Sequence, residues 1–319
     1  MKPRLAILQP ALRALSARRC LLKLRGSLPV IPTPFFENKI DYASLERLFD
    51  HLFPELDGYT LCGSTGEAVS LSLEERIELM RFAAQHTPSG KVIVAGLTHT
   101  NLAEMQKLAR AAVELGIHAG LVPCPYYFPN EFSMVFEFFR ELDRASPLPL
   151  VLYDNPLYTK TWLRTEEIFR LLDACPNLRG VKMTDHDLRK LERLKRETNT
   201  SLFSGDDVVA FRSLLLGVDG SMIIAPSIFP AAYQETVRLL EANDAEAALQ
   251  VFSAQVLPFI HMFGPGDEVS VTKAVFHSIG IFRSPEARLP LLPCTPARLR
   301  ETMLAYGICQ PAAGVRAAK

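Results

Sequence analysis

A lysine that ends an apolar run of residues has a type and a position suited to chemistry. Lys182 lies in the run RGVKMT, residues 179–184, whose composition is that of a buried strand. Burying an ammonium group costs free energy unless the group is paired or loses its proton. Desolvation therefore favours the neutral amine, which attacks carbonyl carbons and forms an imine. The alternative is a lysine just past the strand end, whose amino group reaches solvent.

Two hydroxyl side chains lie between glycines where the run YTLCG ends. The segment GSTGE, residues 63–67, places Ser64 and Thr65 just ahead of an amphipathic stretch. Backbone N–H groups that glycines leave accessible, together with hydroxyl donors, can bind an anion such as a carboxylate. The alternative is an ordinary loop whose hydroxyls cap the following helix.

Tyrosines end two further apolar runs. Tyr126 and Tyr127 follow the run at 119–125. Adjacent tyrosines point in different directions, so we expect at most one of them to serve a site, and the core or an interface is the alternative. Tyr153 lies in the run LVLYDNP, where its phenol could relay a proton or form a hydrogen bond within the core.

Acidic and hydroxyl side chains end the last two runs. The segment SGDD, residues 204–207, ends in Asp207, and GVDGS, residues 217–221, ends in Ser221. A carboxylate at such a position could bind a substrate hydroxyl or cap the next helix.

Eight apolar runs, alternating with amphipathic stretches of helical period, must position these side chains. This alternation predicts right-handed strand–helix–strand units and a parallel sheet. Eight units predict an α/β fold, the (β/α)8 TIM barrel, with chemistry at the C-terminal ends of the strands. An open doubly wound sheet is the alternative, but it usually has fewer strands and a glycine-rich first turn. The runs span residues 30–35, 59–63, 92–96, 119–125, 150–156, 179–184, 201–206 and 220–225.

The chain divides into four predicted parts. Residues 1–26 are basic and contain no acidic residue, which is typical of a basic N-terminal extension or a mitochondrial transit peptide. Residues 27–242 form the predicted barrel, and 243–310 read as a C-terminal extension of three helices. Residues 311–319 show no periodicity and are interpreted as a tail.

The composition excludes several classes of function. Lysine plus arginine and aspartate plus glutamate are equal at 35 each, so no net charge attracts nucleic acid. The six cysteines are scattered without metal-ligand spacing, which predicts a reduced intracellular chain. No apolar run approaches the roughly 18 residues that span a bilayer. We expect a cytoplasmic protein without metal, nucleic-acid or membrane partners, or a mitochondrial one if residues 1–26 are a transit peptide.

The strand endings, taken in order, resemble those of the dihydrodipicolinate synthase / N-acetylneuraminate lyase family from about Leu28 to Gly307. The motifs that carry the resemblance are GSTGE, PYY, YDNP, GVKMTD, SGDD and GVDGS. The resemblance implies that Lys182 forms a Schiff base with the ketone of pyruvate or a related 2-oxo acid. A covalent lysine imine needs no cofactor, so none is expected.

The resemblance also implies roles for other residues. Tyr153 matches the family's proton relay, which also contacts the substrate carboxylate. Ser64 and Thr65 match the hydroxyl pair that binds this carboxylate. Tyr127 matches the tyrosine that reaches across a tight dimer interface into the neighbouring site. Members of the family are typically homotetramers, built as dimers of dimers.

One departure from the family concerns the second substrate of its synthases. Those enzymes usually carry an arginine two residues after the proline of the YDNP-type motif, to receive a carboxylate. This chain has Tyr158 there, and a tyrosine cannot supply a bidentate cation. Lysine biosynthesis is therefore disfavoured unless Lys160 or Arg164 substitutes.

A second departure concerns the sialic acid lyases. The chain resembles them in Thr184 and in Asp207, the first of an acidic pair that holds sugar hydroxyls, but Val208 occupies the second place. We count Thr184, Asp207 and Ser221 as substrate-binding candidates and expect a substrate shorter than sialic acid.

The leading hypothesis is an aldolase that cleaves a 2-keto-3-deoxy sugar acid or a 4-hydroxy-2-oxo acid to pyruvate. Three alternatives use the same scaffold. The imine could eliminate water or ammonia, which would make the chain a dehydratase or deaminase. The chain could be a 4-hydroxy-tetrahydrodipicolinate synthase, or it could bind a 2-oxo acid without catalysis.

Overall fold

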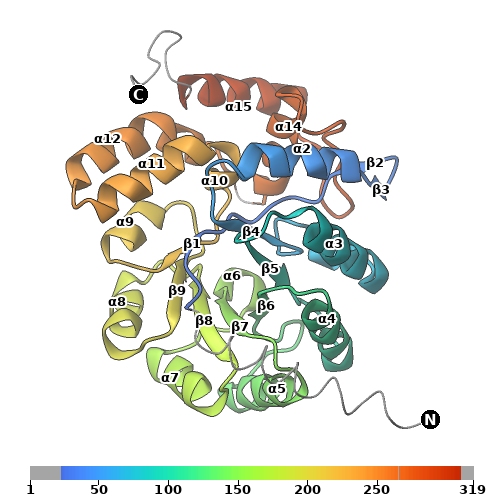
Figure 1. Ribbon diagram of the computed structural model, residues 1–319, viewed down its shortest axis with the longest axis vertical. Helices are drawn as coiled ribbons and strands as arrows, with labels where there is room; N and C mark the ends of the chain where they lie inside the picture. Colours follow the sequence, from blue (N-terminus) through green and yellow to red (C-terminus); the bar gives the residue numbers. More distant parts are fainter. Residues whose placement is uncertain (1–22, 265, 310–319) are drawn as a thin grey trace.

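Eight parallel strands form a closed barrel, as predicted (Figure 1). The computed structural model describes residues 23–264 and 266–309, so the predicted tail and most of the predicted N-terminal extension lie outside the described residues. The barrel closes where the Ile31 N–H donates to the Thr60 carbonyl oxygen at 3.0 Å. Around the barrel the strands are β1 (Gly26–Ser27), β10 (Gly220–Ser221), β9 (Ser201–Ser204), β8 (Leu178–Met183), β7 (Leu150–Asp154), β6 (Ala119–Pro123), β5 (Val92–Gly96) and β4 (Gly58–Leu61).

The first strand lies earlier than its predicted run at residues 30–35. β1 pairs with β10 at Gly26 and Ser27, so the barrel begins one residue before the predicted boundary at 27. Three prolines at positions 29, 32 and 34 have no N–H to donate, which interrupts a regular ladder over the predicted run. The end of that run instead forms an antiparallel hairpin of β2 (Phe35–Phe36) with β3 (Lys39–Ile40).

The eighth strand is shorter than its predicted run at 220–225. β10 ends at Ser221, and the short helix α10 (Ala225–Ile228) begins at the end of that run. Pro226 lies in the first turn of α10, where its missing N–H costs nothing.

Helices surround the barrel on its outside (Figure 1). Side chains cap the starts of two of these helices. Ser72 and Glu75 form a capping box at the start of α3, and the Asn101 side chain accepts from the Ala103 N–H at the start of α4. The outer helices are α2 (Tyr42–Leu52), α3 (Leu73–His86), α4 (Leu102–Glu114), α5 (Phe132–Ala145), α7 (Thr165–Ala174), α8 (Leu188–Glu197), α9 (Ala210–Leu215) and α11 (Pro230–Glu241).

The C-terminal extension is helical, but its first predicted helix is divided in two. α12 (Ala245–Gln255) ends before Val256, and α13 (Leu257–Ile260) follows it. Pro258 explains the break, because proline removes a helical N–H and its ring clashes with the preceding turn. The remaining helices are α14 (Glu268–Ser278) and α15 (Pro296–Cys309).

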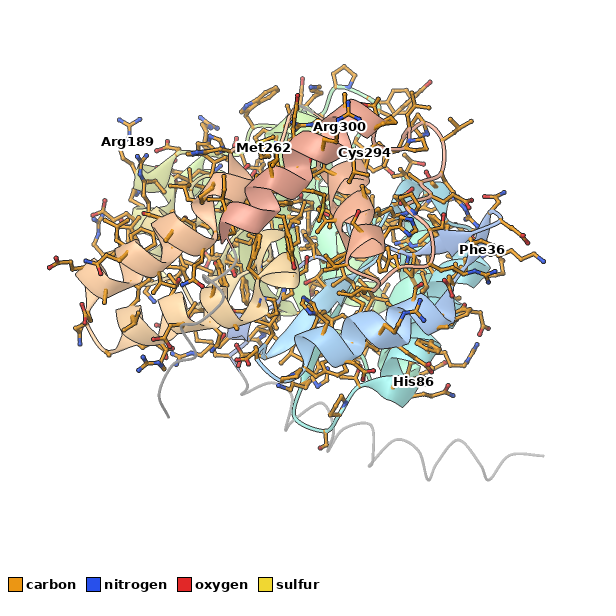
Figure 2. The ribbon with its side chains drawn as sticks, turned by 90° about the horizontal axis from the view of Figure 1, so that it is seen from above. Phe36, His86, Arg189, Met262, Cys294 and Arg300 are labelled. Atoms are coloured by element: carbon orange, nitrogen blue, oxygen red, sulfur yellow. The ribbon has the colours of Figure 1, made fainter. Side chains whose placement is uncertain are left out.

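The extension packs against the barrel through aromatic side chains. The Phe229 ring, just before α11, stacks on Tyr306 of α15 with 5.5 Å between ring centres. Figure 2 shows Met262, Cys294 and Arg300 on this extension. No helix in residues 23–264 or 266–309 is long and apolar enough to cross a membrane.

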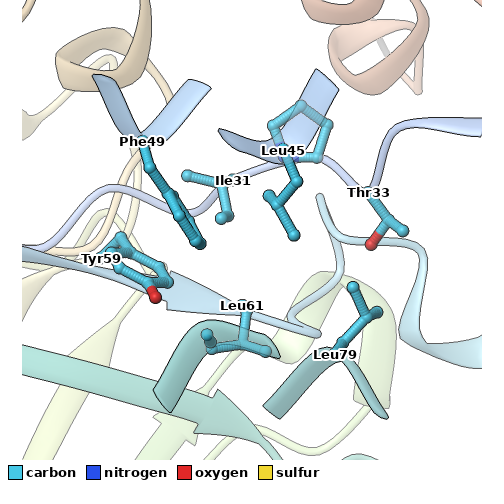
Figure 3. A pocket seen from close by; sticks show the side chains of 9 residues that line it. Ile31, Thr33, Leu45, Phe49, Tyr59, Leu61 and Leu79 are labelled. Atoms are coloured by element: carbon cyan, nitrogen blue, oxygen red, sulfur yellow. The ribbon is translucent and has the colours of Figure 1, made fainter. Parts of the chain in front are cut away.

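A small cavity lies between α2 and the barrel wall (Figure 3). Its lining is almost entirely apolar, and Leu45 and Phe49 of α2 face Tyr59 and Leu61 of β4 across it. Such a lining offers no convergent polar groups to a ligand, so we interpret the cavity as part of the hydrophobic core.

Candidate active site

Lys182 is an interior residue of β8, and only 3% of it is exposed. It is in register with Tyr153 of the neighbouring strand β7. The Lys182 Nζ atom lies 4.1 Å from the centre of the Tyr153 ring. The amine is thus held inside the barrel against a phenol, and does not extend past a strand end into solvent.

The Tyr153 phenol is the common partner of several polar groups. The Asn155 Nδ2 donates to its oxygen at 2.8 Å, and the hydroxyls of Ser64 and Thr184 also form hydrogen bonds with it. Burial alone would raise the pKa of the phenol. The Lys182 ammonium and these hydrogen bonds outweigh burial and hold the pKa of Tyr153 below its ordinary value. A phenol of this kind is suited to passing a proton.

The predicted Ser64–Thr65 loop is tightly folded at the end of β4. Its two ends, Cys62 and Glu67, adopt left-handed backbone conformations with φ of 53° and 55°. A side chain on Gly66 would place its Cβ 2.9 Å from the Cys62 nitrogen, so only glycine fits there. Ser64 is exposed and Thr65 is nearly buried. The loop therefore brings at least the Ser64 hydroxyl to Tyr153.

Thr184 comes directly after β8 and lies beside the same phenol. Its backbone N–H donates to the Asp154 carbonyl oxygen at 3.0 Å, which continues the pairing of β8 with β7. The structure thus brings together four of the predicted site residues: Lys182, Tyr153, Ser64 and Thr184.

Asp207 is bound by two backbone N–H groups near the start of α10. Its two carboxylate oxygens accept from the backbone N–H groups of Ile224 at 3.1 Å and Ala225 at 2.7 Å. Of the two predicted roles, the geometry matches capping, although the capped helix is α10 and not the next helix, α9. Burial raises the pKa of the Asp207 carboxyl to about 6.

Ser221 lies on the other face of the barrel wall from Lys182. Its strand position is in register with Ser204, which is in register with Met183. Side chains alternate across a strand, so Ser221 shares the face of Met183 and not that of Lys182. Its buried hydroxyl lies beside the Tyr233 phenol of α11. The prediction that Ser221 binds substrate does not agree with this placement.

Tyr127 lies outside the cluster around Lys182. It is 85% exposed and has a φ of 85°, a left-handed conformation that is rare for a bulky residue. Its ring lies against the neighbouring Phe128 ring, with 5.2 Å between centres. Its predicted role in a partner's site stays a prediction.

Two features of the site were not predicted from the sequence. Asn155 both donates to Tyr153 and caps the short helix α6 (Pro156–Thr159), whose Tyr158 N–H it accepts at 3.2 Å. The Asn-Pro pair is a helix-start signal that could have drawn attention to Asn155. Asp154 is fully buried and pairs with Lys190 of α8 at 2.5 Å, which ties the end of β7 to the helix layer.

The place of the family arginine has no cation in the described part of the chain. Tyr158 is half-exposed, and burial together with the nearby Glu268 carboxylate raises its pKa to about 12. Arg164 is engaged with Glu167 at 2.7 Å, and Lys160 is an exposed residue at the end of α6. Arg164 is therefore paired with a carboxylate of its own helix, and Lys160 lies on the surface.

The described residues hold no group of three or more histidine, cysteine, aspartate or glutamate side chains that could bind a metal ion. The expectation of chemistry without metal or cofactor stays a prediction.

Comparison with known proteins gives a consistent set of relatives. A model of the dihydrodipicolinate synthetase family matches residues 23–305. A 4-hydroxy-tetrahydrodipicolinate synthase of Azoarcus sp. (strain BH72) is 31% identical over 274 residues, 85% of this chain and 93% of that protein. An N-acetylneuraminate lyase of Shigella boydii serotype 4 is 30% identical over 284 residues, 87% of this chain and 94% of that protein. The solved 4-hydroxy-tetrahydrodipicolinate synthase of Methylacidiphilum fumariolicum SolV superposes with a TM-score of 0.85 at 27% identity, covering 90% and 96% of the two chains.

Proposed function

The chain belongs to the dihydrodipicolinate synthetase family, a family of lyases, and from this premise we propose that it cleaves a small hydroxylated 2-oxo acid through an imine on Lys182. The proposed substrates are 2-keto-3-deoxy sugar acids or 4-hydroxy-2-oxo acids, and the products are pyruvate and an aldehyde. The observation that carries the proposal is the buried Lys182 amine 4.1 Å from the ring of Tyr153.

The first step is attack of the neutral Lys182 amine on the C2 ketone carbon of the substrate. The C–N bond forms as the carbonyl oxygen leaves as water, and the product is a protonated imine. Tyr153 is the group beside the amine that can donate and accept the protons of this exchange. Ser64 and Thr65 are proposed to hold the substrate carboxylate through their hydroxyls and the loop backbone.

The second step breaks the bond between C3 and C4. The Tyr153 phenolate accepts the proton of the C4 hydroxyl, the C4 oxygen becomes an aldehyde, and the bonding electrons move into the imine to give an enamine. Because the pKa of Tyr153 lies below its ordinary value, the phenolate that this step needs is favoured. The enamine then takes a proton at C3, and water hydrolyses the imine to release pyruvate and the free amine.

The surroundings of Tyr158 support a substrate with one carboxylate. A second carboxylate would meet the Tyr158 phenol there. The carboxylates of Glu268 and Asp206 lie close enough to disfavour ionisation of that phenol. Like charges repel an anionic tail, whereas hydroxyl groups can hydrogen-bond to all three side chains. Val208 is 62% exposed where a polyol would need a second acid, which supports a short tail.

The synthase reaction is a second candidate, because relatives of 29–31% identity carry that name. It would use the same imine but condense the enamine with an aldehyde that bears a carboxylate. The missing cation at Tyr158 speaks against it. Elimination of water or ammonia from the imine also stays open as a route.

A panel of hydroxylated 2-oxo acids tests the proposed reaction. Each compound is incubated with the wild-type protein and with Lys182→Ala, and the products are separated by mass spectrometry. Release of pyruvate with an aldehyde, lost in the variant, supports the lyase. An oxo-semialdehyde in place of pyruvate indicates a dehydratase, and turnover only of pyruvate with an amino-aldehyde acid indicates the synthase.

We also propose that the enzyme is a homotetramer in which Tyr127 enters the partner's site. Its exposure of 85% supports a role outside its own subunit. Light scattering should give four times the mass of one chain. A monomer, or a Tyr127→Phe variant with unchanged kcat, would contradict this assembly.

A further inference from the structure

The last residue of the GSTGE loop is buried against the C-terminal extension. The Glu67 side chain is fully buried and forms an ion pair with Lys273 of α14, whose side chain is also fully buried. The backbone N–H of Arg288, in the segment after α14, donates to the Glu67 Oε2 atom at 2.8 Å. The extension thus supplies two of the donors that satisfy a carboxylate in the loop after β4.

A phenylalanine completes the surroundings of this ion pair. The Lys273 Nζ atom lies 4.2 Å from the centre of the Phe35 ring, and the guanidinium carbon of Arg288 lies 4.3 Å from the same centre. Both cations gain from the face of an aromatic ring. Lys273 also donates to the Glu286 carbonyl oxygen at 2.8 Å. The buried amine is therefore held by a carboxylate, a carbonyl and a ring.

Arg288 connects the extension to the loop a second time. Its guanidinium makes a bidentate pair with the Glu75 carboxylate, with both contacts at 2.7 Å, and donates to the Ser70 carbonyl oxygen at 3.0 Å. In return the Ser70 hydroxyl donates to the Leu289 carbonyl oxygen at 3.2 Å. The segment from the GSTGE loop to the start of α3 is therefore bound along its length by residues of the extension.

The loop itself transmits the position of Glu67 to the hydroxyl pair. Glu67 adopts a left-handed backbone conformation, which a residue with a side chain keeps only when its surroundings hold it. Its N–H donates to the Ser64 carbonyl oxygen at 3.0 Å. Gly66 between them fits against Cys62 without room for a side chain. A shift of the Glu67 carboxylate would therefore move the backbone that carries Ser64.

We propose that Lys273 and Arg288 are positioning residues, which act through Glu67 to hold the hydroxyl loop where it binds the substrate carboxylate. A buried ion pair adds little net stability compared with apolar residues, but it fixes one geometry. The C-terminal extension is on this account part of the substrate site, although it contributes no group to the reaction. The inference rests on the proposed function, because it takes Ser64 and Thr65 as the carboxylate-binding pair.

Binding of pyruvate tests the inference. The variants are Glu67→Gln and Lys273→Met, and Lys273→Arg is the conservative comparison. Arg298→Gln is the matched control, because the partners of Arg298 in the described part of the chain, Asp267 at 2.8 Å among them, all lie within the extension. Borohydride reduction traps the imine, so the yield of adduct against pyruvate concentration gives the half-saturating concentration.

We expect Glu67→Gln and Lys273→Met to raise the half-saturating pyruvate concentration about tenfold, the effect of losing one charge-assisted contact. The yield at saturating pyruvate should stay that of the wild type, because Lys182 is untouched. Lys273→Arg should recover part of the loss, and Arg298→Gln should match the wild type. Folded variants of Glu67 and Lys273 with wild-type half-saturation would overturn the inference.

Hydrogen exchange tests this inference independently of the proposed function, because it needs no pyruvate binding. It also provides a test if the Glu67 or Lys273 variants fold poorly. Arg288→Lys removes the guanidinium contacts with Glu75, Ser70 and Asn38 but keeps the backbone N–H bond to Glu67. In this variant the amides of residues 63–68 should exchange faster, while those of β8 keep their protection. Unchanged exchange in the loop would overturn the inference even if pyruvate binds. If the wild type traps no pyruvate, the proposed function fails, and loop exchange alone then decides the positioning role.

Discussion

Lys182 and Tyr153 face each other from adjacent strands, in register, with the amine nitrogen 4.1 Å from the centre of the phenol ring. This arrangement brings a nucleophile and a proton carrier to one point. The amine alone can form the imine, but cleavage also needs a base for the substrate hydroxyl. Lys182 forms the imine and Tyr153 transfers the proton, so substitutions of the two residues should have different effects.

Removing the phenol oxygen should stop cleavage more than imine formation. Tyr153→Phe keeps the ring beside Lys182 and is expected to lower kcat by about a hundredfold to ten-thousandfold, the usual worth of a positioned proton donor or acceptor. Borohydride trapping of pyruvate should still label the lysine after long incubation. Tyr59→Phe, which loses a buried phenol bonded to Thr87, is the matched control and should keep wild-type kcat. A Tyr153→Phe variant with full activity would remove the phenol from the mechanism.

Asn155 should set the ionisation of Tyr153. Asn155→Asp keeps an oxygen that can accept the Tyr158 N–H, but it replaces the donor to the phenol by a carboxylate. A nearby negative charge disfavours the phenolate, so the pKa of Tyr153 should rise. We expect the rise in kcat/KM with pH to move to higher pH in this variant. A pH profile that coincides with that of the wild type would show that Asn155 has no such influence.

Restoring a cation at position 158 should change substrate choice. Tyr158→Arg places a guanidinium beside Glu268 and Asp206, where a second substrate carboxylate could pair with it. The ratio of kcat/KM for dicarboxylic over monocarboxylic 2-oxo acids should rise about tenfold or more, the equivalent of one good charged contact. Tyr158→Lys supplies the positive charge without the bidentate geometry of a guanidinium, so the ratio should rise less in this variant. An unchanged ratio in both variants would place substrate selection elsewhere.

Asp207 should make stability depend on pH. Its folded-state pKa is about 6 against an ordinary value of 3.8, so the folded protein holds this proton more tightly than the unfolded chain. Its contribution to the free energy of unfolding is fully present below about pH 4 and is lost as the pH rises through about 6. Between these limits the wild type should lose on the order of 3 kcal/mol relative to Asp207→Asn. Denaturant unfolding of both proteins from pH 4 to 7 measures the difference, and parallel curves would contradict it.

The barrel and its central lysine could be predicted because they depend on local patterns. Apolar runs that alternate with amphipathic stretches give the strand count, and a charge inside such a run marks Lys182. The first strand begins earlier in the chain than its composition predicts, because prolines interrupt pairing over the predicted run. The break at Pro258 has the same cause in a helix.

The failures in the site have a different origin, namely contacts between distant parts of the chain. Ser221 follows a glycine in a motif at a strand end, but only the register with β9 and β8 shows that it faces α11. Glu67 ends the GSTGE motif, but its partner Lys273 lies far along the chain in α14, and no local pattern connects the two residues. From the sequence, a carboxylate such as Asp207 could equally bind substrate or cap a helix. Only the backbone N–H groups that it accepts from decide between the two roles.

The most direct test of the account is the identity of the lysine that pyruvate modifies. The wild-type protein is incubated with pyruvate, reduced with borohydride, digested and mapped by mass spectrometry, beside Lys182→Ala and the exposed-helix control Lys195→Ala. We predict a reduced adduct on Lys182 in the wild type and in Lys195→Ala, and none in a folded Lys182→Ala. No adduct in the wild type, or an adduct that persists in Lys182→Ala, would contradict the central claim.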